Sequence, residues 1–211
     1  MLPPGVAHHV TRLALRGSST AELQGMLMRL EEAAGLLADA GVGLIAFHCT
    51  AVSTAAPEIA GSIVRRIEAA TGIRAFSTAD AILAACHHLN IRRVHLLTPY
   101  TEAVHRQETE FLEARGVHVA SGACMKIDTN AEMGRLTPGD LLTFARLHVP
   151  AANACLLSCT AIRSASVIAA LEEEMAIPVL TSNQVMIWYA LRLLGTPKPR
   201  PGFGRLLAAE P

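Results

Sequence analysis

The sequence predicts an α/β protein with mainly parallel sheets, and three observations support this prediction. Short apolar runs alternate with longer segments in which apolar residues recur at helical spacing. Hydrophobic residues make up 51% of the 211 residues and aromatic residues only 4%, a balance typical of alanine-rich helices layered on a sheet. One order of strand, turn and helix also occurs twice, which indicates two related halves.

The strands are predicted from short apolar runs that end in polar or glycine-containing turns. Residues 10–15 correspond in the repeat to residues 117–120, so they are expected to form a strand as well. The other runs expected as strands are 42–47, 73–76, 93–97, 117–120, 154–157 and 177–180.

Helices are predicted between the strands from their apolar spacing and their end signals. Ser19 and Glu22 have the spacing of a capping box. Gly72 ends a second helix, and Thr137-Pro138 begins a later one, because proline is well tolerated in the first turn. The expected helices cover residues 20–40, 59–71, 78–89, 101–115, 138–149, 160–175 and 182–194.

The repeat centres on a cysteine turn. The first copy reads His48-Cys49-Thr50-Ala51 and the second Ser158-Cys159-Thr160-Ala161, each after an apolar run and before a helix. Ligands of parallel α/β sheets bind beyond the carboxyl ends of the strands, which is where both turns fall. The repeat therefore predicts two α/β/α half-domains related by a pseudo-twofold axis, with the active site in the cleft between them.

The repeat also predicts the division of the chain. Residues 1–91 together with 195–211 are expected to form the N-terminal half-domain, and residues 92–194 the C-terminal one. The second copy begins with the strand at 93–97 and the turn at 98–100, which have no counterpart in the first copy. The N-terminal half-domain is therefore expected to lack its first strand.

Cysteine at the end of a strand and the start of a helix is suited to thiolate chemistry. A helix N-terminus lowers the pKa of a thiol, and its free N–H groups can hold a carboxylate or the enediolate formed from it. One thiolate could remove a proton from carbon while the opposite thiol returns one to the other face. Alternatively, a thiolate could add to an activated double bond and leave after rotation. The expected catalytic residues are Cys49 and Cys159, and the expected substrate-binding residues are Thr50, Ala51, Tyr100, Thr160 and Ala161.

Composition excludes several other classes of function. Eighteen basic residues balance eighteen acidic ones without a dense Lys/Arg cluster, so neither nucleic acid nor a membrane is expected as a partner. No Cys-x-x-Cys pair and no glycine-rich phosphate loop follows a strand, so neither a metal nor a cofactor is expected. The start of the chain has no signal-peptide pattern and the five cysteines no disulfide framework, so a reduced, cytoplasmic protein is expected. The expected partner is a small carboxylate or dicarboxylate substrate, and a homo-oligomer is left open.

Further motifs give the chain a family resemblance. They are the two Cys-Thr-Ala turns, the segments 96–100 and 181–184, the pairs Ile187-Trp188 and Leu191-Arg192, and the tail 200–206. Together they resemble the Asp/Glu racemase superfamily, in the branch that contains arylmalonate decarboxylases and maleate cis-trans isomerases. The resemblance covers nearly the whole chain and implies two α/β domains around a pseudo-twofold axis without metal or organic cofactor.

The resemblance also assigns roles to individual residues. Cys159 matches the cysteine shared by the branch, which is the proton donor in the decarboxylases. Cys49 falls where the decarboxylases have glycine and where the racemases and maleate isomerases have their first cysteine. Thr50 and Tyr100 match carboxylate-holding hydroxyls of the decarboxylases, whereas Ala51 replaces a frequent serine and retains only its N–H.

The leading hypothesis is a cofactor-independent two-cysteine isomerase or racemase of a small carboxylic acid, with maleate-type cis-trans isomerisation favoured. Cys49 is expected to be the nucleophile or base and Cys159 the opposing acid. Two alternatives stay open at this point. One is a decarboxylase of an arylmalonate-like diacid that uses Cys159 alone, and the other is a non-catalytic binding protein.

Overall fold

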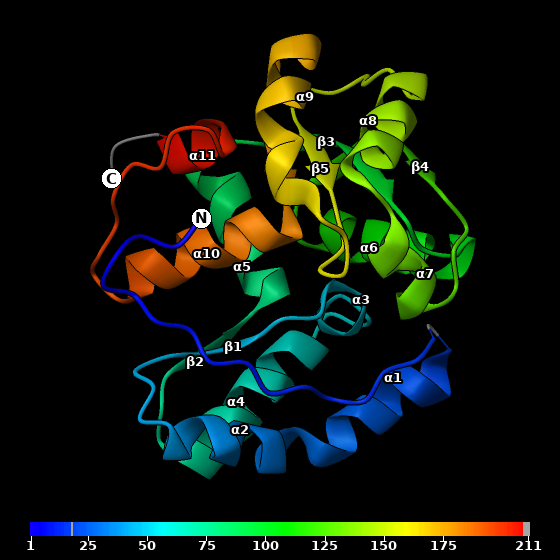
Figure 1. Ribbon diagram of the computed structural model, residues 1–211. Helices are drawn as coiled ribbons and strands as arrows, with labels where there is room; N and C mark the ends of the chain where they lie inside the picture. The colour runs from blue at the N-terminus through cyan, green and yellow to red at the C-terminus, as the bar shows by residue number, and fades with distance from the viewer. Residues whose placement is uncertain (18, 209–211) are drawn as a thin grey trace.

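Two parallel sheets organise the computed structural model, which describes residues 1–17 and 19–208 (Figure 1). The smaller sheet pairs β1 (Ile45–Phe47) with β2 (Ala75–Ser77), and Ile45 lies opposite Ala75. The larger sheet has the strand order β4-β3-β5-β6. Its strands are β3 (Arg93–Thr98), β4 (His118–Cys124), β5 (Cys155–Leu157) and β6 (Val179–Thr181).

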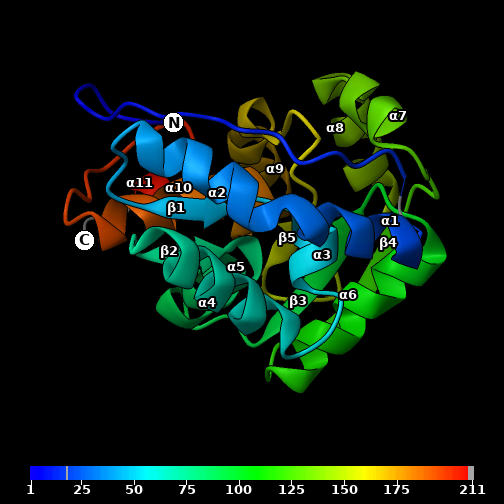
Figure 2. The same ribbon diagram turned by 90° about the horizontal axis from the view of Figure 1, so that it is seen from below.

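Helices connect and cover these strands. Helix α2 packs against α4, and α5 packs against α10, so the two halves meet along a helix pair (Figures 1 and 2). The helices are α1 (Thr20–Met26), η1 (Leu27–Arg29), α2 (Leu30–Asp39), α3 (Thr50–Ser53), α4 (Ile59–Thr71), α5 (Thr78–His88), α6 (Glu102–Ala114), α7 (Asn130–Arg135), α8 (Pro138–Leu147), η2 (Ser164–Ser166), α9 (Ile168–Met175), α10 (Ser182–Leu193) and α11 (Gly204–Ala208).

The predicted α/β class with parallel sheets is confirmed, and six of the predicted strands are present within four residues of their expected ends. The prediction of a strand at residues 10–15 is wrong, because this segment has no strand structure. Its counterpart β4 is held in the sheet by β3, and no described strand offers residues 10–15 the same pairing. Helices α7 and α11 were not expected. The proposed division at residues 91 and 195 stays a prediction.

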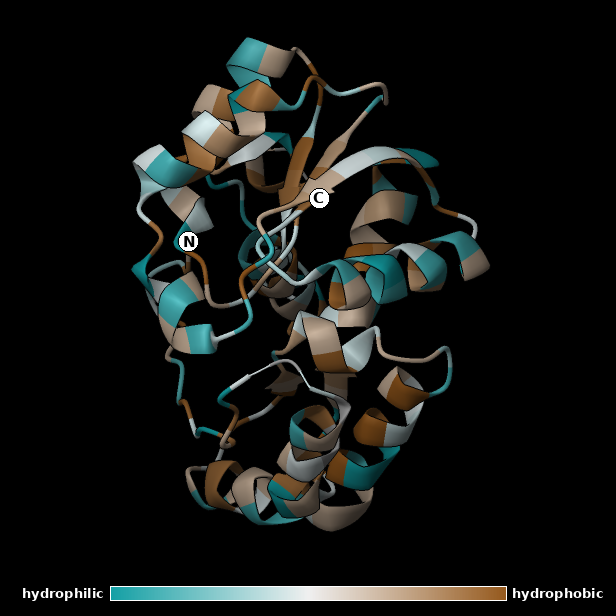
Figure 3. Cartoon of the chain, turned by 90° about the vertical axis from the view of Figure 1, so that its right-hand side faces the viewer, coloured by the Kyte–Doolittle hydropathy of each residue, from teal (hydrophilic) through white to brown (hydrophobic). Residues whose placement is uncertain are grey.

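The end signals of the helices act largely as expected. The Ser19 hydroxyl accepts the Glu22 N–H at 3.3 Å, and Thr137 forms a full capping box with Asp140. Gly72 ends α4 with a φ of +69°, a left-handed conformation that glycine adopts without steric cost. In Figure 3 brown and teal stretches alternate along many helices, as expected when one face of each is buried.

The internal repeat extends to a glutamate that accepts a hydrogen bond from the strand after the cysteine turn in each half. Glu68 on α4 accepts the N–H of Ala75 at 3.0 Å, and Glu172 on α9 accepts the N–H of Val179 at 2.9 Å. The second oxygen of Glu172 also accepts the Arg205 N–H at 2.8 Å, which ties the C-terminal segment to the second half. Equivalent side chains thus perform the same task in both halves, as the predicted pseudo-twofold relation requires.

Within the described part of the chain, no helix has the length and apolar character needed to cross a bilayer.

Candidate active site

Cys49 lies between β1 and α3. It is the N-cap residue of that helix, with extended backbone, and it is 7% exposed. The Val52 N–H approaches its thiol. Thr50 and Ala51 are the first two residues of α3, so their N–H groups have no acceptor within the helix. The first turn therefore has the predicted geometry, although its helix is only 4 residues long.

Cys159 follows β5 and is 2% exposed. Its sulfur accepts the Ala161 N–H at 3.3 Å, and the Tyr100 hydroxyl also hydrogen-bonds to it. The expected helix does not begin at this turn, because regular structure resumes only at Ser164, with η2. The prediction of a helix N-terminus directly behind Cys159 is therefore wrong, and single N–H groups of an irregular turn take its place.

Ser182 joins the two turns. Its hydroxyl oxygen accepts the Cys159 N–H at 3.1 Å and the Thr50 hydroxyl at 2.9 Å, and it lies 3.4 Å from the Ser158 hydroxyl. Ser182 is the first residue of α10 and is fully buried. Both Figures 1 and 2 show α3 beside the end of β5, where these contacts form.

His48 makes a second link between the halves. Its Nε2 lies 2.9 Å from Asn183 Oδ1, and its Nδ1 lies 3.2 Å from the Thr78 hydroxyl. The Asn183 amide donates in turn to the Ile162 carbonyl at 2.9 Å. Burial lowers the pKa of His48, although the bond to Asn183 opposes that shift, so the neutral ring is favoured. His48 therefore orients the chain next to Cys49 without adding a charge to it.

The thiols are less acidic than the sequence predicted. Burial raises the pKa of Cys49 to about 12 and that of Cys159 to about 11, and in both cases this exceeds the lowering effect of the nearby N–H groups. Tyr100, 4% exposed, has its pKa raised well above the usual value by burial, so its phenol keeps its proton. The predicted lowering of the thiol pKa values is wrong in this closed site because removal of water outweighs a short helix.

Glu108 is an acidic residue of this site that sequence reasoning missed. It lies on the inward face of α6 with Val104, Phe111 and Leu112, and it is fully buried. Neither of its carboxyl oxygens makes a hydrogen bond. The Ser158 hydroxyl is nevertheless near enough to favour the charged form, and burial raises the pKa of Glu108 to about 7.

Met133 is another missed residue, and its sulfur lies 4.0 Å from the Cys159 sulfur. It belongs to α7, a helix that was not predicted from the sequence. Glu108, by contrast, could have been found from its spacing. A glutamate at an otherwise apolar helical spacing is unusual on a buried face. Ser182 carried a signal as well, since it stands in the repeated polar cap.

The structure brings most of the predicted residues together. Cys49, Cys159 and Tyr100 are close enough to influence one another's ionisation, and Thr50 is linked to the Cys159 turn through Ser182. The Ala51 carbonyl accepts a bond from Gln107 at 3.4 Å. Thr160 and Ala161 are half-buried on the second turn, and the Ala161 N–H is used by the Cys159 sulfur rather than free for a ligand.

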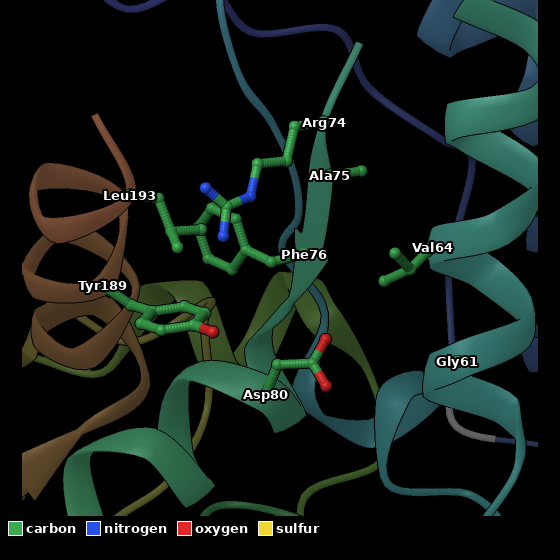
Figure 4. Close-up of a pocket in the computed structure, with 8 residues that line it drawn as sticks. All are labelled: Gly61, Val64, Arg74, Ala75, Phe76, Asp80, Tyr189 and Leu193. Carbon is green, nitrogen blue, oxygen red and sulfur yellow. The ribbon is translucent and has the colours of Figure 1, made fainter. Parts of the chain in front are cut away.

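A separate pocket of about 230 Å³ lies away from the cysteines (Figure 4). Arg74, just before β2, Asp80 on α5 and Tyr189 on α10 point toward it. Among the described residues, no three His, Cys, Asp or Glu side chains are grouped as ligands of a metal ion.

Two related α/β halves whose cysteine turns meet at one buried site define a pseudo-symmetric α/β protein with a two-thiol centre. A family model described as arylmalonate decarboxylase matches residues 1–207, and the chain belongs to that family.

Curated relatives include both kinds of enzyme in this group. The chain is 28% identical over 211 residues to a maleate isomerase of Nocardia farcinica, covering 96% of this chain and 84% of the relative. It is 31% identical over 142 residues to an arylmalonate decarboxylase of Bordetella bronchiseptica, covering 65% of this chain and 59% of the relative.

Solved structures share the fold. The Nocardia farcinica maleate cis-trans isomerase, as a cysteine-to-serine mutant with a covalently bound succinylcysteine intermediate, matches with a TM-score of 0.93 at 24% identity. That match covers 99% of this chain and 89% of the other. A crystal structure of arylmalonate decarboxylase matches with a TM-score of 0.79 at 24% identity over 87% of this chain and 83% of the other.

Proposed function

We propose that the chain is a cofactor-independent isomerase that uses Cys49 and Cys159 on a small unsaturated dicarboxylate, with maleate as the favoured substrate. The observation that carries the proposal is the pair of thiols. Each half contributes one cysteine from the same turn, and Ser182 bonds directly to the Cys159 turn and to Thr50 beside Cys49. Relatives named maleate isomerase support this reading along nearly the whole chain.

In the proposed reaction the Cys49 thiolate adds to one carbon of the double bond. The electron pair of that bond moves into the neighbouring carboxylate, which becomes an enediolate held by the N–H groups of Thr50 and Ala51 and by the Tyr100 hydroxyl. The remaining carbon–carbon single bond rotates, and the electron pair returns to expel the thiolate. Cys159 is the opposing acid in this cycle: its thiol gives a proton to the carbanionic carbon while the single bond rotates, and its thiolate takes that proton back before Cys49 is expelled.

Burial of both thiols fits a reaction that begins only when substrate is present. Burial raises the pKa of Cys49 to about 12, so thiolate is scarce at neutral pH. The donors around the turn must therefore assist its formation once substrate is bound. A protected thiol of this kind is also slow to oxidise.

The proposal is tested by following maleate and fumarate by proton NMR. Cys49→Ala and Cys159→Ser are each expected to lower isomerase turnover at least about a hundredfold, because each removes a reacting group. Cys86→Ala is the matched control, since Cys86 is equally buried but belongs to a different hydrophobic cluster. Full turnover by Cys49→Ala would show the assignment to be wrong.

Decarboxylation of an arylmalonate-like diacid is the second candidate, favoured by one observation. Cys159 has more donors than Cys49, namely Tyr100 and the N–H groups of Ala161 and Ile162, and its pKa is the lower of the two. Release of carbon dioxide from phenylmalonate that survives Cys49→Gly would identify this activity. A non-catalytic binding protein would show neither reaction, and dicarboxylates would protect neither thiol from alkylation.

The proposal includes a reduced compartment, the cytoplasm, because both thiols must stay unoxidised. An assembly of identical chains is compatible with it, and light scattering would measure the oligomeric state.

A further inference from the structure

Glu108 is buried without a hydrogen bond that satisfies either carboxyl oxygen, in a site where the proposed reaction gives it no role. An ionised carboxylate in such a place is costly unless it is paired or bonded. The titratable groups that face it are Cys159, after β5, and Tyr100, after β3, with Cys49 beside Tyr100. Among the described residues, no Lys, Arg or His side chain contributes to the pKa shift of the Glu108 carboxyl.

A row of hydroxyls leads from Glu108 to the first cysteine turn. Ser158 is next to the carboxyl. The Ser158 and Ser182 hydroxyl oxygens are 3.4 Å apart, and those of Ser182 and Thr50 are 2.9 Å apart. Each of the three residues is at most 1% exposed, so the row is closed off from bulk solvent.

The hydrogen bonds along this row of hydroxyls can run in either of two directions. A hydroxyl donates one hydrogen bond and accepts two. With Glu108 ionised, Ser158 donates to the carboxylate, Ser182 donates to Ser158, and Thr50 donates to Ser182, as the structure shows for that last pair. Ser182 then accepts from Thr50 and from the Cys159 N–H, which fills its two acceptor positions.

With Glu108 protonated, every bond in the row reverses. The acid donates to Ser158, Ser158 donates to Ser182, and Ser182 donates to Thr50. Ser182 now accepts from Ser158 and the Cys159 N–H, which again fills both positions. The difference lies at the far end, because only in this state is the Thr50 proton free for a substrate carboxylate.

We propose that Glu108 is a positioning residue that acts through Ser158 and Ser182 and, when protonated, frees the Thr50 hydroxyl to bind the substrate carboxylate. The proposal rests on the proposed function in one respect, that Thr50 faces a carboxylate substrate. Binding of a dianion close to Glu108 favours its neutral form, so substrate binding and protonation of Glu108 promote each other.

The first test is the pH dependence of KM for maleate. Since the pKa of Glu108 is raised to about 7, the neutral fraction falls about tenfold between pH 6 and pH 8, and the KM of the wild type is expected to rise about tenfold. Glu108→Gln keeps a donor toward Ser158, so its KM is expected to stay at the low-pH value throughout. Glu110→Gln is the matched control on the exposed face of α6, and it keeps the wild-type profile.

Ser158→Ala distinguishes the hydrogen-bond relay, which runs from Glu108 through Ser158 and Ser182 to Thr50, from a direct effect of the Glu108 charge on the substrate. If the Glu108 charge simply repelled the substrate, the pH dependence would persist in this variant. The relay requires that it disappear, because Ser182 can then donate only to Thr50. A flat wild-type profile, or a pH dependence that persists in Ser158→Ala or Glu108→Gln, overturns the proposal.

The second test needs no substrate and so distinguishes failure of the relay from failure of the proposed function. Carbon-13 NMR of the unliganded chain is expected to show the Glu108 carboxyl titrating near pH 7. In Ser158→Ala the pKa should rise, because a hydroxyl that donates to the carboxylate is lost. Titration below pH 5, or no response to Ser158→Ala, would show that the relay does not exist even if isomerase turnover is present.

Discussion

The Thr50 hydroxyl lies 2.9 Å from the hydroxyl of Ser182 and donates its proton to it. Thr50 begins α3 in the first half of the repeat, and Ser182 begins α10 in the second. The same Ser182 oxygen accepts the Cys159 N–H at 3.1 Å. One serine therefore fixes the distance between the two cysteine turns, and the relative position of the two thiols depends on it.

The first prediction concerns this serine. Ser182→Ala leaves the buried Cys159 N–H without an acceptor and the Thr50 hydroxyl without its partner. The expected loss is about 1–3 kcal/mol of the free energy of unfolding, the usual cost of an unsatisfied buried group. Urea unfolding followed by circular dichroism measures it.

The control for this substitution is Ser166→Ala, at an exposed position of η2. Its effect is expected to stay within about 0.5 kcal/mol, as for most surface changes. Equal unfolding midpoints for the two variants would mean that Ser182 does not hold the turns together.

The repeat could be predicted from the sequence because its signals are local. The runs that became β1 and β5 end directly before the cysteine turns, so the strand pattern alone brought Cys49 and Cys159 to equivalent places. Tyr100 was predicted largely from the family resemblance of the segment 96–100, since its position after a strand fits a packing residue equally well. Glu108 and Met133 were missed for different reasons: the spacing of Glu108 signals only a buried glutamate, and its place near Ser158 depends on how α6 packs, whereas Met133 lies on α7, which was not predicted.

The ionisation of the thiols could not be predicted from the sequence for a physical reason. A helix N-terminus lowers a thiol pKa within one turn, and its position can be read from the residue order. Burial raises the pKa, and it depends on every segment that packs around the site. At Cys49 the surrounding core includes Val52, Leu97 and Leu157 from three separate segments. Their combined exclusion of water decides the pKa against the helix.

The second prediction follows from those pKa values. With the pKa of Cys49 at about 12, its thiolate at neutral pH is roughly a thousandfold scarcer than that of an ordinary thiol. Iodoacetamide is therefore expected to alkylate the half-buried Cys124 before Cys49 or Cys159. The rates at the two buried thiols should rise about tenfold per pH unit between pH 7 and pH 9.

Mass spectrometry of peptic peptides assigns each alkylated cysteine. Cys124 serves as the internal reference in the same sample. Faster labelling of Cys49 than of Cys124 at pH 7 would contradict the burial of Cys49 in the structure.

The third prediction concerns the C-terminal segment that docks on the second half. Gly204 has a φ of +79°, and an added Cβ would meet Ile168 and lie 2.8 Å from the Gln184 amide nitrogen. Gly204→Ala is expected to cost about 3 kcal/mol, from the left-handed backbone and from overpacking together. Urea unfolding reports the loss.

Gly202→Ala is the matched control for this pair of effects. Gly202 has a φ of +89° but no atom within 4 Å of the added Cβ, so it should show only the backbone part, about 1–2 kcal/mol. If both variants lose the same stability, the segment is not packed against α9 and α10 as described.

The fourth prediction is that Glu108 makes the protein less stable as pH rises. Its pKa is raised from about 4.5 to about 7 in the folded chain by burial, so the folded state binds a proton that the unfolded state releases. The resulting stability is fully present below pH 4.5 and is lost as pH rises through 7. A shift of this size corresponds to a loss on the order of 3 kcal/mol across that window.

Glu108→Gln removes the titrating group and retains its shape, so the contribution of residue 108 to the pH dependence should vanish. The measurement is the free energy of urea unfolding at pH 5, 6, 7 and 8 for the wild type and the variant. Their difference should grow in favour of the variant up to about pH 7 and then level off, because above both pKa values the proton count of the two states is equal. A constant difference would mean that Glu108 is already ionised at pH 5. The carboxylate would then have a partner that stabilises its charge, and the relay through Ser158 would be locked in one direction.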